Sequence, residues 1–79
     1  MDINTVGESA GRLWAALGAQ KRLALGELSK ALGGDAVLAG MAAGWLAREG
    51  KIEMETQGRR VFLRLTAAEA EEYRKSTGA

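Results

Sequence analysis

Residues 35–65 read DAVLAGMAAGWLAREGKIEMETQGRRVFLRL, and this stretch decides the fold. Apolar residues recur at three- and four-residue steps over 35–50, which is the spacing of an amphipathic helix. Strand-like alternation follows over 51–65 and is broken at Gln57-Gly58, a pair typical of a two-residue turn. The stretch therefore predicts a helix that runs directly into a β-hairpin.

The predicted helix has two unlike sides. Its inward side is expected to hold Val37, Leu38, Met41, Ala42, Trp45 and Leu46. Its outward side is expected to hold Ala36, Ala39, Gly40, Ala43 and Ala47. Alanine and glycine lack the side-chain donors and acceptors that are needed to distinguish bases in a DNA groove.

The hairpin register follows from the position of its turn. The predicted pairs are Met54 with Val61, Ile52 with Leu63, Glu55 with Arg60 and Lys51 with Arg64. Because side chains alternate between the two faces of a strand, the four apolar residues share one face. Phe62 is then expected on the other face.

The rest of the chain adds helices before and after this stretch. A first helix is predicted over 2–17, with its start at Asp2 and its stop at Gly18. A connector over 19–25 follows, in which Leu23 and Leu25 form a brief strand edge, and then a second helix over 26–32. A Gly33-Gly34 turn leads to the N-cap of the third helix at Asp35; that helix ends at Gly50, and a last helix runs to about Lys75. Thr66 and Glu69 have the spacing of a capping box, which marks the start of the last helix. Residues 1–79 are thus expected to form one α+β domain that is mostly α-helical.

Composition excludes several classes of function. Eleven Lys and Arg against ten Asp and Glu give a formal net charge of +1, and the chain has no Cys and no His. Disulfides, thiolate chemistry and imidazole catalysis are therefore absent, and a zinc site is not expected. A strong nucleic-acid binder normally has a larger basic excess. The chain also lacks a membrane-span or signal-peptide pattern, so a cytoplasmic location is expected.

No arrangement of residues supports catalysis. Glu53 and Glu55 are expected on an exposed strand face and not in a cleft, where catalytic carboxylates are normally found. Ser9, Ser29 and Ser76 have no histidine or evident lysine base to activate them. We therefore expect a non-enzymatic domain without a cofactor or a small-molecule ligand.

Three segments resemble known winged-helix proteins. Residues 65–69, LTAAE, resemble the step by which many winged helix-turn-helix domains leave the wing for a final helix. Residues 7–14, GESAGRLW, and 44–52, GWLAREGKI, resemble a family of small bacterial and archaeal winged-helix domains of unknown function. The resemblance covers nearly the whole chain up to Leu65. It implies a three-helix core, a β-hairpin wing and a short C-terminal helix, a fold usually associated with DNA, although fold alone does not determine function.

The wing is the stronger candidate for contact with nucleic acid. Arg59 and Arg60 at its tip suit phosphates or the minor groove, while Glu53 and Glu55 offset part of their charge. The candidate nucleic-acid-binding residues are Arg59, Arg60, Lys51, Lys30, Arg22 and Lys21. Charges at a hairpin tip also keep strand edges from pairing, so phosphate contact and simple solvation both remain open.

A protein interface is the alternative. Its candidate residues are Ala36, Ala39, Gly40, Ala43, Ala47, Phe62 and Tyr73. Phe62 and Tyr73 either cover each other within one chain or contribute to a dimer seam, and Trp14 and Trp45 are expected in the core. Two hypotheses follow: a DNA-binding or transcription-associated module that touches duplex DNA weakly through its wing, and a module for homodimerisation or binding another protein that does not bind DNA.

Overall fold

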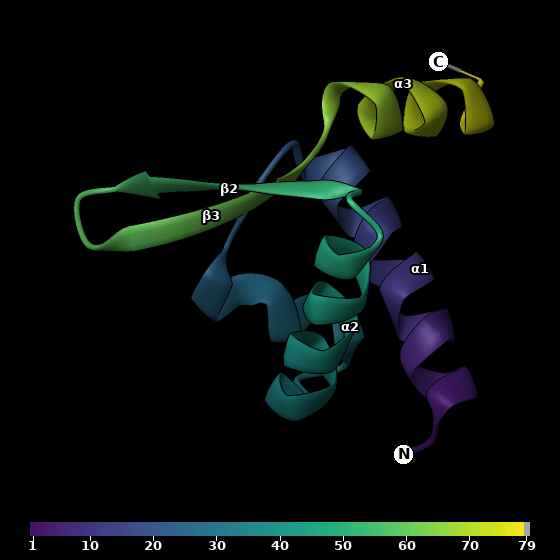
Figure 1. The fold of residues 1–79 in the computed structure, drawn as a ribbon, viewed down its shortest axis with the longest axis vertical. Helices are drawn as coiled ribbons and strands as arrows, with labels where there is room; N and C mark the ends of the chain where they lie inside the picture. The colour runs from purple at the N-terminus through teal and green to yellow at the C-terminus, as the bar shows by residue number, and fades with distance from the viewer. Residues whose placement is uncertain (79) are drawn as a thin grey trace.

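The computed structural model describes residues 1–78, and its elements follow the predicted order. They are α1 (Ile3–Gln20), β1 (Leu23–Ala24), the 3₁₀-helix η1 (Leu25–Leu32), α2 (Ala36–Arg48), β2 (Ile52–Gln57), β3 (Arg60–Leu65) and α3 (Ala67–Ser76). The first three helical elements pack together, the hairpin of β2 and β3 projects sideways from one end of them, and α3 lies over that end (Figure 1). The α+β class predicted from the sequence is confirmed.

Helix α1 begins as predicted but ends later. Asp2 caps it by accepting a hydrogen bond from the Thr5 backbone N–H at 2.8 Å. This bond holds the pKa of the Asp2 carboxyl below its ordinary value of 3.8. The predicted stop at Gly18 is wrong, because the helix continues to Gln20 and Lys21 then leaves it with a φ of +74°.

The segment after α1 differs from the prediction in its type of helix and in the exposure of Leu25. Residues 25–32 form a 3₁₀-helix, and Glu27 reaches back to accept a hydrogen bond from the Ala24 N–H at 3.0 Å. Ala24 rather than Leu25 completes the short strand β1, so Leu25 lies outside the core and is 54% exposed.

Helix α2 is capped as predicted, but the expected division of its two sides is partly wrong. Asp35 accepts a hydrogen bond from the Leu38 N–H at 2.9 Å. Ala39 and Ala43, expected to face outward, are buried, whereas Val37 and Met41, expected inward, are 69% and 49% exposed. The small side chains are buried because α2 packs closely against both α1 and η1.

The sheet has three antiparallel strands in the order β1-β3-β2. The predicted turn at Gln57-Gly58 is wrong: Gln57 pairs with Arg60, so Gly58 and Arg59 form the turn, and Gly58 has a φ of +61°. The register is thereby displaced by two residues. Because a displacement of two preserves the face of every side chain, the predicted faces still hold.

The corrected register pairs different residues than expected. The pairs that replace the predicted ones are Ile52 with Leu65, Glu53 with Arg64, Met54 with Leu63, Glu55 with Phe62 and Thr56 with Val61. Ile52, Leu63 and Leu65 are buried, whereas Met54 is 64% exposed on the projecting part of the hairpin.

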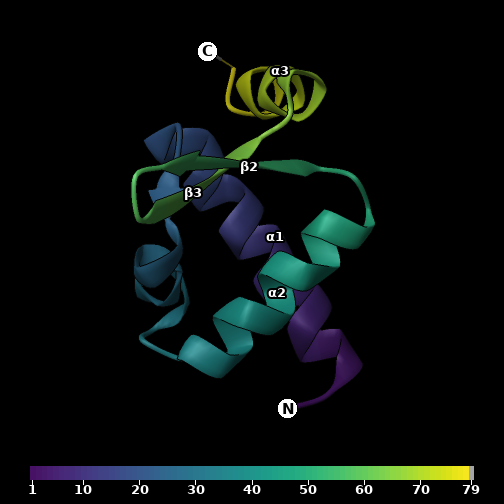
Figure 2. The ribbon, with the colours of Figure 1, turned by 60° about the vertical axis from the view of Figure 1, so that its left-hand side comes forward.

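Helix α3 rests on the end of α1, as the second view shows (Figure 2). Thr66 caps it by accepting a hydrogen bond from the Glu69 N–H at 3.3 Å. The other half of the predicted capping box does not form, because the Thr66 N–H donates to the Lys51 carbonyl at 3.1 Å. None of the ten residues of α3 is buried.

The core lies between α1, η1, α2 and the inner face of the sheet. Its buried members are Val6, Ala10, Leu13, Leu17, Leu28, Leu32, Leu38, Ala39, Ala42, Ala43, Leu46, Ile52, Leu63 and Leu65. Trp14 and Trp45, expected within the core, are only half-buried and pack against its edge.

Candidate nucleic-acid interface

The tip of the hairpin places two cations side by side. Arg59 lies in the turn, Arg60 begins β3, and both are exposed. Neither residue forms an ion pair within residues 1–78. Together with Leu25 and Gly26 at the start of η1 they line a shallow groove. The wing tip, meaning Arg59 and Arg60, therefore presents two uncompensated guanidinium groups on one surface.

Arg22, in contrast, is held on the outer face of the sheet. Its guanidinium lies 3.9 Å from the centre of the Phe62 ring, and that of Arg60 lies 4.8 Å from the same centre. The two cations thus cover Phe62, which is 7% exposed. The expectation that Phe62 contributes an exposed aromatic to an interface is therefore wrong.

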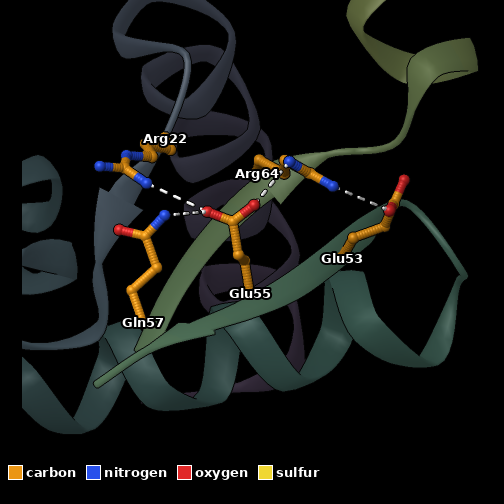
Figure 3. Close-up of polar contacts among 5 residues, drawn as sticks. All are labelled: Arg22, Glu53, Glu55, Gln57 and Arg64. Carbon is orange, nitrogen blue, oxygen red and sulfur yellow. Dashed lines mark hydrogen bonds and ion pairs between the residues drawn. The ribbon is translucent and has the colours of Figure 1, made fainter. Parts of the chain in front are cut away.

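Glu55 links Arg22, one of the two arginines that cover Phe62, to the hairpin (Figure 3). Its carboxylate accepts from Arg22 Nη1 at 3.1 Å, from Arg64 Nη1 at 3.0 Å and from Gln57 Nε2 at 3.3 Å. Arg64 Nη2 also lies 3.6 Å from Glu53 Oε2. Arg22 and Arg64 are therefore already paired with carboxylates, and less of their charge remains available to an outside anion.

The three predicted lysines lie elsewhere. Lys51 Nζ is 3.7 Å from Glu49 Oε1. Lys21 lines a cleft between α1 and α3 together with Tyr73, and Lys30 lines another cleft between η1 and α1. The structure thus places only Arg59 and Arg60, among the six predicted residues, together at the wing tip.

The outward surface of α2 has no means of reading bases. Its exposed residues are Ala36, Val37, Gly40, Met41, Gly44, Ala47 and Arg48. We call this set the α2 face. Six of the seven have no polar side chain, and Arg48 is at the C-terminal end of the helix. Major-groove recognition normally needs polar side chains that reach base edges, so the α2 face does not suit that task.

Tyr73 and Phe62 do not form one surface. The Tyr73 ring packs edge-on against Trp14, with the ring centres 5.6 Å apart, and lies against Gly18 of α1. Phe62 is covered by arginines on the outer face of the sheet. Tyr73 therefore serves to dock α3 on α1, and the predicted joint patch is not found.

Sequence reasoning missed Glu69 as a contact of the core. Glu69 Oε1 accepts a hydrogen bond from Trp14 Nε1 at 2.9 Å, and both residues line a groove with Trp45. The two residues are separated by 55 positions, so no local pattern indicates the contact. The capping-box spacing instead suggested that Glu69 would turn back to Thr66.

Comparison with known proteins identifies the domain. Residues 1–65 match the family described as Winged helix-turn-helix domain (DUF2582). No curated protein and no solved structure matches the chain. Within residues 1–78, none of the helices has the length and hydropathy needed to cross a membrane.

Proposed function

Because the chain belongs to the winged helix-turn-helix family DUF2582, we propose that it associates with duplex DNA through its wing tip and without reading bases. The observation that carries this proposal is the adjacency of Arg59 and Arg60 at the end of a hairpin that projects from the helices (Figure 1). Both are exposed, and within residues 1–78 neither forms an ion pair. Glu27, the carboxylate that lines the same groove, is engaged with the Ala24 N–H. Two guanidinium groups suit phosphate oxygens or a narrow minor groove.

This mode of binding is weak and depends strongly on salt. Each phosphate that the protein neutralises releases counterions, so two contacts give a slope of about −2 for log K against log salt concentration. Binding through phosphates alone is independent of base sequence. The net charge of +1 adds little long-range attraction.

A salt titration tests the proposal. Binding of a short fluorescent duplex is measured by anisotropy at several salt concentrations, starting from low salt. We expect the double variant Arg59→Ala/Arg60→Ala to bring the slope close to zero and Arg59→Ala alone to halve it. Circular dichroism verifies that each variant is folded, because Arg60 also covers Phe62.

The matched control is Arg74→Ala/Lys75→Ala, which removes the same charge from α3. Both control residues already pair with Glu71 and Glu72, so the slope should not change. Absence of duplex binding by the wild type at low salt would contradict the proposal. An equal loss of binding in the control and in the wing-tip variant would contradict it as well.

A second candidate function is association with another protein through the α2 face. The exposure of Val37 and Met41, at 69% and 49%, favours it, because large apolar side chains are exposed there beside small ones. Figure 2 shows no other element in front of the near side of α2. This function is compatible with DNA contact, since Arg59 and Arg60 are not part of the α2 face.

A further inference from the structure

A groove between α1, α2 and α3 is lined by both tryptophans of the chain. Its volume is about 470 Å³, and Trp14 of α1, Trp45 of α2 and Glu69 of α3 all border it. We call it the indole groove. The two tryptophans are half-buried, so each keeps part of its surface open. No residue of the wing tip or of the α2 face lines the indole groove, which is therefore separate from the two surfaces described above.

The carboxylates of the indole groove outnumber its cations. Glu49, Glu69 and Glu72 line it, against the ammonium group of Lys51. Lys51 Nζ lies 3.7 Å from Glu49 Oε1, and Glu72 Oε1 lies 3.9 Å from Lys75 Nζ. Glu69 forms no ion pair within residues 1–78. The lining of the indole groove is therefore negative, and Glu69 is its uncompensated carboxylate.

The surroundings of Glu69 favour one class of ligand. The residue is half-buried, and its Oε1 accepts the hydrogen bond from Trp14 Nε1 at 2.9 Å. A carboxylate that is partly withdrawn from water loses hydration, which a cationic partner offsets. Indole is also the aromatic ring that attracts cations most strongly. A carboxylate between two indoles therefore suits a ligand that has both a positive charge and an apolar body.

We propose that the indole groove binds a small organic cation, an ammonium or guanidinium group on a short alkyl chain. The charged group pairs with Glu69, and the alkyl chain lies against Trp14 and Trp45. The volume of the groove is within the range of small-molecule sites. The proposal replaces the expectation, drawn from the sequence, that the chain has no small-molecule ligand. No local motif indicates this site, because three separate helices contribute to it.

The first test compares n-butylguanidinium with n-butylurea, a neutral molecule of nearly the same shape. The chain has two tryptophans, so its two indole N–H signals in a ¹H–¹⁵N spectrum both report on the indole groove. We expect n-butylguanidinium to shift the Trp14 signal with half-saturation in the millimolar range. The urea should bind at least about tenfold more weakly, because it lacks the charge. Sodium chloride at equal concentration controls for ionic strength.

Glu69→Gln tests the charge while it keeps the contact between α3 and α1. The amide oxygen of glutamine can still accept the hydrogen bond from Trp14. The affinity for n-butylguanidinium should fall by about tenfold or more. Glu71→Gln is the matched control, since it removes the same charge from α3 outside the indole groove. This control should bind as the wild type does.

Hydrogen exchange gives a second, independent measurement. Glu69 belongs to α3 and the tryptophans belong to α1 and α2, so detachment of α3 would destroy the site. Ligand at about ten times its dissociation constant should therefore slow the exchange of α3 amides by about tenfold. The same concentration of n-butylurea should leave this exchange unchanged.

Three outcomes would overturn the proposal. One is a Trp14 signal that n-butylguanidinium leaves unchanged or that n-butylurea shifts equally. Another is an affinity that Glu69→Gln does not lower, or that Glu71→Gln lowers as much. The third is exchange of α3 that saturating n-butylguanidinium does not slow. None of these measurements involves DNA or another protein, so their result is independent of the wing tip and of the α2 face.

Discussion

At the scale of single residues, Gly18 determines where α3 can lie. A Cβ built at this position would overlap the Tyr73 ring, which rests directly on the helix backbone. Glycine is usually unfavourable inside a helix because it has more conformational freedom to lose. Here the absent side chain leaves room for an aromatic ring, which explains why a glycine that resembles a helix stop lies inside α1.

We expect Gly18→Ala to destabilise the protein even though alanine favours helices. The added methyl must displace Tyr73 from α1, and such overpacking typically costs about 1–3 kcal/mol. Gly11→Ala is the matched control, because a Cβ at Gly11 meets nothing within 4 Å. The control should gain about 0.5–1 kcal/mol. Urea unfolding of both variants measures the difference, and equal effects of the two substitutions would contradict this role of Gly18.

Residue contacts were predictable from the sequence when they were local. Asp2, Asp35 and Thr66 each accept a hydrogen bond from the N–H three residues ahead, and sequence spacing alone indicates such caps. Arg22 and Glu55 are separated by 33 positions, and Trp14 and Glu69 by 55. Those contacts depend on how the elements pack, so no motif in the chain reveals them.

At the scale of elements, α2 shows why hydrophobicity alone assigned some residues to the wrong side. Ranking residues by size places Val37 and Met41 inward. The helix buries Leu38, Ala42 and Leu46 as expected, but it adds Ala39 and Ala43 to them instead of Val37 and Met41, because α2 packs closely against α1 and η1. The helix and its cap were therefore predictable, whereas its rotation about its own axis depended on the spacing between helices.

The corrected orientation predicts opposite effects of one substitution at two neighbouring positions. Ala43→Arg should lower the free energy of unfolding by roughly 3–5 kcal/mol, since Ala43 is buried and an arginine there would lack a partner. Gly40→Arg should raise it by about 0.5–1 kcal/mol, because arginine favours the helix and the position is open. Thermal or urea unfolding checks both. Comparable destabilisation by the two variants would mean that the orientation of α2 is wrong.

Carboxylates of the wing offset part of the positive charge of the arginines around it. Glu55 is the shared acceptor for Arg22 and Arg64, and the residues involved are 32–48% exposed. Exposed ion pairs contribute little to stability, typically less than about 1 kcal/mol. The main effect of Glu55 is therefore on the electrostatic field around the sheet.

Glu55→Gln should leave the free energy of unfolding within about 1 kcal/mol of the wild type. It should also strengthen duplex binding and steepen the salt slope by up to about 2, because Arg22 and Arg64 become available to phosphates. Glu72→Gln removes the same charge from α3, outside the wing, and serves as the control. A slope that responds equally to both variants would show that net charge, and not the wing, governs the effect.

At the scale of the whole molecule, the wing tip and the α2 face are proposed to have different roles. The wing tip would contact the DNA backbone, while the α2 face, which lacks base-reading groups, would bind another protein. The net charge of +1 per chain keeps general attraction to DNA low.

The class of fold was the most predictable property of the whole chain, and the location of a functional surface was the least. Helix spacing, caps and strand alternation lie within short windows of sequence. Arg59 and Arg60 are neighbours in the chain, so their grouping at the hairpin tip was predictable, whereas the separation of Lys21 and Lys30 from them depends on how the hairpin and helices are placed in space.

The shallow attachment of α3 also has a consequence for motion. The helix buries none of its residues and is held to α1 through Tyr73 on Gly18 and through Glu69 on Trp14. Segments with few buried contacts open at lower free energy than the core to which they are attached. The backbone amides of α3 should accordingly exchange with solvent deuterium well before those of α1 and β3. We therefore expect a low-lying state, besides the native one, in which the three-helix core and wing persist while the C-terminal helix is detached.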